Sequence, residues 1–219
     1  MPATASPVTT VASADQRNQN NAVGAILQSL GRTVIAGVVV LVVIIVLVGS
    51  ITGGMIKIDH AWSTFFIRWL HVLSGVMWIG LLWYFNFVQI PSMPKIPDEQ
   101  KPAIGKVIAP TALFWFRWAA LATVVTGLLV TWMNGSIGQA LMIARPFHAI
   151  GIGMWLGLVM AFNVWFIIWP NQKKALGMVQ VEAAEKAAAA RLAMLTSRFN
   201  TMLSIPMLYC MVAQSHGGF

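Results

Sequence analysis

The chain has 219 residues, of which 58% are hydrophobic and only 9% are charged. Soluble globular domains carry charge on about a quarter of their residues, so this composition excludes an ordinary soluble protein and indicates a membrane protein. The formal net charge of +8 would suggest nucleic acid if it lay on a soluble surface. In a membrane protein it reflects topology and contact with anionic lipid, and we expect no nucleic-acid partner.

Taken in chain order, the sequence begins with a polar segment that is rich in Ser, Thr, Ala, Asn and Gln. We expect residues 1–31 to form a disordered cytoplasmic tail and residues 32–219 to form a transmembrane helical domain. Four apolar stretches then exceed the roughly 20 residues that a helix needs to cross the hydrocarbon core. They cover 33–56, 69–94, 107–133 and 146–169, and a shorter fifth stretch, 199–214, reaches that length only if it begins near residue 195.

Segments that cross lipid must satisfy every backbone polar group internally, which requires helices here. The sequence therefore predicts an all-α, polytopic membrane bundle of five transmembrane helices. Ten Lys and Arg residues fall on the side of the tail and three on the other, which predicts a cytoplasmic N-terminus and an external C-terminus. The Ala-rich segment 178–195, in which Glu182 precedes Lys186 by four residues, favours a helix on the cytoplasmic surface.

Spans two and four carry the same motif with the same spacing. The first copy is Arg68, His71, Met77, Trp78 and Gly80, and the second is Arg145, His148, Met154, Trp155 and Gly157. Both spans run from outside to inside, so the copies would be parallel. We expect a parallel two-helix repeat, spans 2–3 and spans 4–5, that forms a four-helix bundle with span one outside it.

The repeated motif predicts a haem b site. His71 and His148 each follow an arginine by about one helical turn, and a tryptophan, Trp78 or Trp155, lies seven residues further on roughly the same face. We expect Gly75 and Gly151 to leave room for a flat ligand. His71 and His148 would then ligate the iron between spans two and four, and the propionates would reach Arg68 and Arg145.

Other interpretations of the histidines stay open. A histidine in a span can simply bond to a neighbouring helix. His60 and His216 also fall at the predicted outer face, where they would meet water, replace a ligand, serve a second haem, or form a copper or zinc site with another histidine.

Four segments in a characteristic order carry a family resemblance. They are residues 68–80, which begin Arg-Trp-Leu-His; 114–118, Phe-Trp-Phe-Arg-Trp; 161–172, Ala-Phe-Asn to Pro-Asn-Gln; and 198–216, Arg-Phe-Asn to Gln-Ser-His. Across about residues 60–219 the chain resembles the membrane domain of the bacterial integral-membrane urate oxidase, without the fused cytochrome c. The resemblance implies a urate-oxidising module of the bacterial inner membrane that passes electrons to a cytochrome c. By matching position, it adds Asn163, Asn200 and His216 to the two motif histidines as functional candidates.

The chain departs from the family pattern at two places. Arg117-Trp118-Ala119 stands where the family has Lys-Trp-Glu, and Phe199-Asn200 stands where it has His-Asn. These changes remove groups suited to proton transfer from a purine. We therefore expect a b-type haem electron-transfer module that exchanges electrons with a cytochrome c or a larger respiratory complex. Urate oxidation by the chain itself and a cofactor-free accessory subunit of a membrane complex are the alternatives.

Overall fold

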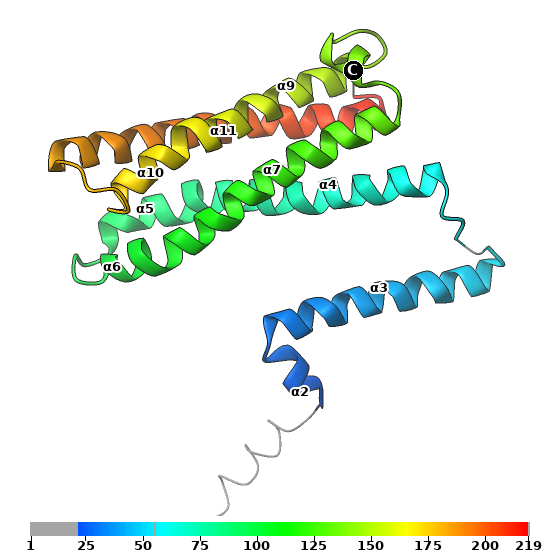
Figure 1. The fold of residues 1–219 in the computed structure, drawn as a ribbon, viewed down its shortest axis with the longest axis horizontal. Coiled ribbons are helices and arrows are strands. Elements are labelled where there is room, and N and C mark those ends of the chain that lie inside the picture. The colour runs from blue at the N-terminus through cyan, green and yellow to red at the C-terminus, as the bar shows by residue number, and fades with distance from the viewer. Residues whose placement is uncertain (1–21, 55, 219) are drawn as a thin grey trace, which may run out of the picture. The chain divides into compact units, whose positions relative to one another are not determined.

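The computed structural model describes residues 22–54 and 56–218, and all regular secondary structure in these residues is helical. This confirms the predicted all-α class. The chain divides into two units, residues 1–57 and 58–219. In the first unit, the described residues form a short helix α2 (Ala22–Leu27) and the long apolar helix α3 (Leu30–Thr52) (Figure 1). Residues 1–21 of the predicted tail lie outside the described residues, whereas its residues 22–27 are helical.

The second unit consists of long helices, and all but the last of them are assembled from consecutive segments (Figure 1). The first contains α4 (His60–Trp83), η1 (Tyr84–Gln89), α5 (Ile90–Ser92) and η2 (Met93–Lys95). The second contains α6 (Lys101–Ala103), η3 (Ile104–Ile108) and α7 (Ala109–Met133). After the short α8 (Ile137–Leu141), the third contains α9 (His148–Phe162), η4 (Asn163–Ile168) and α10 (Trp169–Ala175), and α11 (Ala183–His216) completes the unit.

Three of these segments, η1, η3 and η4, are π-helical turns, and each ends two residues before a proline: Pro91, Pro110 and Pro170. A proline lacks the backbone N–H and its ring clashes with the carbonyl one turn earlier. The preceding turn therefore widens, which produces a π-helical segment without ending the helix.

Four described helices are long and apolar enough to cross a membrane: Leu30–Thr52, His60–Lys95, Lys101–Met133 and His148–Ala175. They contain or overlap the first four predicted spans. The predicted fifth span lies inside α11, a single 34-residue helix that also includes most of the predicted surface segment 178–195. The sequence thus divided into two elements what the structure forms as one helix.

Helix packing in the second unit defines a four-helix bundle. The most extensive packing is α4 against α7 and α9 against α11, with lighter packing of α7 on α9 and α11 on α4. The contacts run from α4 to α7, from α7 to α9, from α9 to α11 and from α11 back to α4. The helices α4 and α9 therefore lie diagonally across the bundle. The core between them is made of large apolar side chains, among them Trp78, Leu82, Phe116, Met160 and Val164.

Candidate functional site

The half-buried imidazole of His71 lies against α7. Its Nδ1 is 2.8 Å from the carbonyl oxygen of Thr123 and 3.3 Å from Oγ1 of Thr126. Because a carbonyl oxygen can only accept, Nδ1 carries the proton and Nε2 keeps a free lone pair. Nε2 makes no hydrogen bond to any residue that the structure describes. A ring that donates through one nitrogen to a backbone carbonyl and presents the other is the usual arrangement of a metal-ligating histidine.

Gly127 allows His71 to lie in this position. A Cβ added to Gly127 would lie 2.8 Å from Cε1 and 3.1 Å from Nδ1 of His71, so any larger residue would displace the ring. The sequence motif contained no indication of this glycine or of Thr123 and Thr126, because all three belong to the neighbouring helix.

The second copy of the motif has different surroundings. His148 is the first residue of α9 and is half-buried, while Arg145 and the matching Arg68 are both exposed. Trp78 is 1% exposed in the core, whereas Trp155 is 47% exposed and donates its Nε1–H to the carbonyl of Leu141 at 3.0 Å.

The room that we expected beside two glycines is filled by protein. A Cβ on Gly151 would collide with the carbonyl oxygen of Ala140, because α8 packs directly on α9 there. A Cβ on Gly75 would meet the methyl group of Thr123 at 3.9 Å. The expected space for a flat ligand is therefore wrong for Gly151, and Gly75 faces α7.

The other two histidines are exposed. Nε2 of His60 is 3.0 Å from the carbonyl oxygen of Met133, and Nδ1 of His216 is 3.0 Å from the carbonyl oxygen of Val212 in its own helix. Within residues 22–54 and 56–218, no three His, Cys, Asp or Glu side chains gather in a group that could hold a metal ion.

A buried polar stripe runs along α11 and consists of Ser197, Asn200 and Ser204. Their spacing of three and four residues places them on one helical face. Asn163 donates from Nδ2 to Oδ1 of Asn200 at 2.8 Å, and Asn200 donates to the carbonyl of Met160 at 2.9 Å. The resemblance had singled out both asparagines, and the structure brings them together.

The stripe also receives two side chains from the first long helix of the bundle. Asn86 donates to Oγ of Ser197 at 2.8 Å, and Trp83 donates to Oγ of Ser204 at 3.0 Å. Asn86 and Asn163 have the same separation along the chain as His71 and His148, and both lie in π-helical segments. Asn86 was not among the predicted residues, although the repeat, extended by a few residues, includes it.

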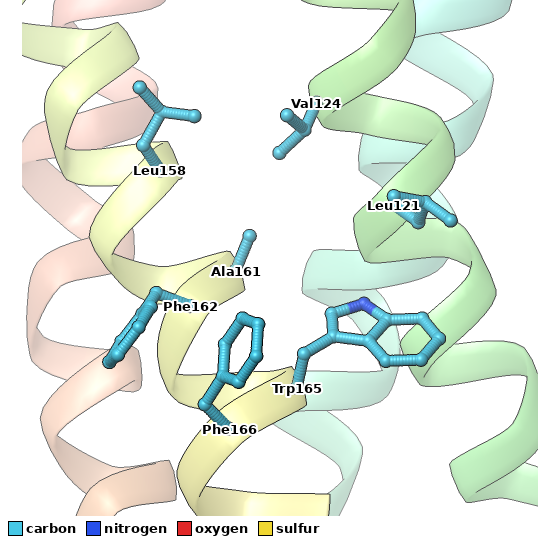
Figure 2. Close-up of a pocket in the computed structure, with 7 residues that line it drawn as sticks. All are labelled: Leu121, Val124, Leu158, Ala161, Phe162, Trp165 and Phe166. Atoms are coloured by element: carbon cyan, nitrogen blue, oxygen red, sulfur yellow. The ribbon is translucent and has the colours of Figure 1, made fainter.

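An open apolar groove of about 460 Å³ lies between α7 and the helix made of α9 and η4. Figure 2 shows the indole of Trp165 extending from η4 toward α7 beside the stacked rings of Phe162 and Phe166. A smaller groove between α4 and α7 is equally apolar. Such surfaces suit lipid acyl chains, in keeping with helices that can span a membrane.

Comparison with known proteins bears on the second half of the bundle. Residues 137–218 match the family described as urate oxidase N-terminal. The match includes His148, Asn163, Asn200 and His216, but it begins after the helices that carry His71 and Thr123. No curated protein and no solved structure matches the chain. The resemblance inferred from the sequence is thereby confirmed for residues 137–218, which are similar to the urate oxidase N-terminal family.

Proposed function

We propose that the chain is a membrane redox protein, a b-type haem-binding module that transfers electrons. The observation that carries this proposal is the orientation of His71, whose Nδ1 lies 2.8 Å from the Thr123 carbonyl while Nε2 stays free. Haem supplies four of its own nitrogen ligands to iron, so one or two imidazoles are sufficient. When bound, haem b takes up and releases single electrons.

In this proposal His71 and His148 hold the iron. Their helices, α4 and α9, lie diagonally across the bundle, on either side of its apolar core. The indole Nε1 of Trp78 is buried and has no hydrogen-bond partner in the described part of the chain, which leaves a donor available two turns from His71. Arg68 and Arg145 are exposed guanidinium groups, suited to the carboxylates of the propionates.

The proposed topology has five spans, with α11 as the fifth, in a bacterial inner membrane. The excess of Lys and Arg on one side assigns the N-terminus to the cytoplasm and the motif histidines to the outer half. Spans 2–3 and 4–5 form the repeat, which the matching positions of Asn86 and Asn163 support. Electron exchange would then take place with a periplasmic cytochrome c or with a larger respiratory complex.

Purified full-length chain is expected to show a reducible Soret and alpha band in a reduced-minus-oxidised spectrum. His71→Ala and His148→Ala should each lower the haem content at least tenfold, because each removes an iron ligand. Gly127→Ala should also lower it by displacing the His71 ring. Pyridine haemochrome analysis measures the content.

The controls leave the proposed ligands in place. His60→Ala and His216→Ala remove exposed histidines, and Gly80→Ala adds a methyl group that meets nothing within 4 Å. All three should retain haem. Wild-type protein without haem after growth with a haem precursor, or equal loss in all variants, would refute the proposal.

Urate oxidation is the second candidate, favoured by the family match over the helices that carry the Asn163–Asn200 pair. Membranes containing the chain would then reduce added cytochrome c when urate is supplied, and membranes without the chain would not. Asn163→Leu should abolish the urate-dependent rate while leaving the haem spectrum in place. Absence of turnover in fully haem-loaded membranes would leave electron transfer as the function.

A further inference from the structure

Two cations, Arg117 and Lys173, lie against the ring of one tryptophan, Trp169. The guanidinium carbon of Arg117, on α7, lies 3.3 Å from the ring centroid of Trp169, the first residue of α10. Nζ of Lys173 lies 5.6 Å from the same centroid. The two distances limit the separation of the charges to at most about 9 Å. The stacking orients the planar guanidinium group, since cations are attracted to the face of an indole.

Among the described residues, no carboxylate forms an ion pair with Arg117 or Lys173. The ion pairs in the described residues are Lys101 with Asp98 and Lys174 with Glu185, and neither includes Arg117 or Lys173. Nη1 of Arg117 is buried and has no hydrogen-bond partner among the described residues. Bringing like charges together and burying a donor without a partner both cost free energy. An anion that contacts both Arg117 and Lys173 would offset the repulsion between the two charges.

The position of Arg117 and Lys173 along their helices favours one class of anion. Trp169 ends an apolar stretch, and Lys173 and Lys174 follow about one helical turn later, a sequence typical of the boundary between hydrocarbon and headgroups. Phosphate groups of lipids lie at this level, and guanidinium groups bind their oxygens in a fork. We propose that Arg117, Trp169 and Lys173 form a binding site for the phosphate group of an anionic lipid. This site is independent of the proposed haem and of the residues that would hold it.

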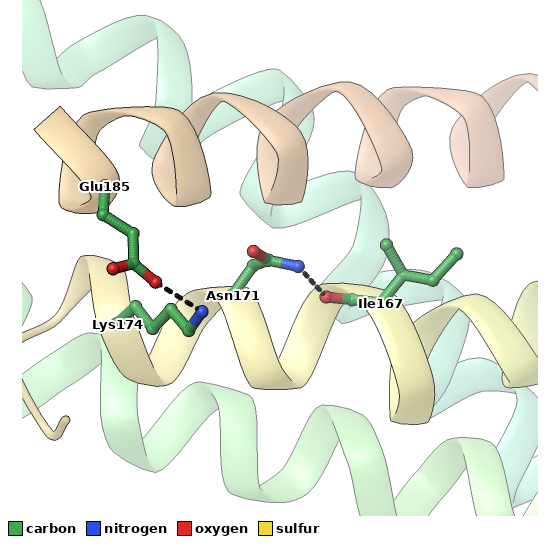
Figure 3. Close-up of polar contacts among 4 residues, drawn as sticks. All are labelled: Ile167, Asn171, Lys174 and Glu185. Carbon is green, nitrogen blue, oxygen red and sulfur yellow. Dashed lines mark hydrogen bonds and ion pairs between the residues drawn. The ribbon is translucent and has the colours of Figure 1, made fainter. Parts of the chain in front are cut away.

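The neighbouring residue supplies a matched control. Lys174 already forms an ion pair with Glu185 of α11 at 2.7 Å (Figure 3), so its charge is compensated within the protein. Arg198, on α11, is exposed and has no aromatic ring stacked on it among the described residues. Substitution by glutamine removes one positive charge from each of the four cations, Arg117, Lys173, Lys174 and Arg198. A difference between the first two and the last two variants would therefore indicate a defined site, not a general attraction between charges.

The test uses the full chain in a neutral detergent, with phosphatidylglycerol added and bound lipid counted by native mass spectrometry. Wild-type protein should retain phosphatidylglycerol and release phosphatidylcholine, which has the same phosphate but no net charge. Arg117→Gln and Lys173→Gln should each weaken phosphatidylglycerol binding about tenfold, as expected for losing a charge-assisted hydrogen bond. Lys174→Gln and Arg198→Gln should bind like the wild type.

Equal weakening in all four variants would overturn the site, because it would indicate a general electrostatic attraction. If millimolar inorganic phosphate displaces the lipid, the site binds free phosphate, and the proposal of a lipid ligand is wrong. If Arg117→Gln fails to elute as folded protein in gel filtration, Lys173→Gln provides the same test, since Lys173 is half-buried on the surface of α10 and makes no side-chain hydrogen bond to a described residue.

Discussion

Replacing Asn200 with alanine is expected to destabilise the bundle by about 2–3 kcal/mol. The Asn200 side chain is fully buried and makes two hydrogen bonds, one with Asn163 and one with the carbonyl of Met160. Interhelical hydrogen bonds in membrane proteins contribute about 0.6–1.7 kcal/mol each, and the truncated side chain leaves a small void in addition. The free energy of unfolding in mixed detergent micelles, followed by circular dichroism, measures the loss.

Asn171 provides the control for this substitution. Its side chain is half-buried and donates only to the carbonyl of Ile167, one turn earlier in its own helix (Figure 3). Asn171→Ala should therefore cost less than about 1 kcal/mol, since no contact between helices is lost. Asn163→Ala and the double variant complete a cycle in which the two losses should not add, because both remove the same bond. Additive losses, or equal losses for Asn171 and Asn200, would contradict this account of the stripe.

The sequence predicted the existence of the long helices better than their ends. Apolar stretches mark where a helix is surrounded by hydrocarbon, not where its hydrogen bonding stops. The second predicted span therefore begins at residue 69, whereas the helix begins at His60, where the carboxylate of Asp59 accepts from the N–H of Trp62. For the same reason the polar first half of α11 looked like a separate surface element.

The candidate site was predictable where it depended on one helix and not where it depended on two. The spacing of the repeated motif identified His71, and the family resemblance placed Asn163 and Asn200 among the candidates. Thr123 and Gly127 became visible only with the rotation of α7 toward α4, which no pattern within α7 specifies. The role of Gly151 was misread because α8 has only five residues and follows directly after an apolar span. A helix that short has no periodicity to detect.

Gly151→Ala is expected to have the largest local effect of any small substitution in the second half of the bundle. The added methyl group would occupy the position of the Ala140 carbonyl oxygen, which is backbone and cannot rotate away. Either α8 separates from α9, or α8 and α9 shift together. Overpacking of this kind lowers the free energy of unfolding by about 1–3 kcal/mol or more. Separation would also break the bond from Trp155 to the Leu141 carbonyl.

Hydrogen exchange measured by mass spectrometry distinguishes these two responses to Gly151→Ala. Separation of α8 should accelerate exchange in residues 137–144, while the interior of α11 stays protected. Gly157→Ala is the matched control on the same helix, because its methyl group meets nothing within 4 Å and alanine is the better helix former. Unchanged exchange and an unchanged unfolding temperature in Gly151→Ala would mean that α8 does not pack on α9 as described. His148 is the first residue of α9, the helix on which α8 packs. If α8 fixes the position of His148, faster exchange in Gly151→Ala should coincide with lower haem content.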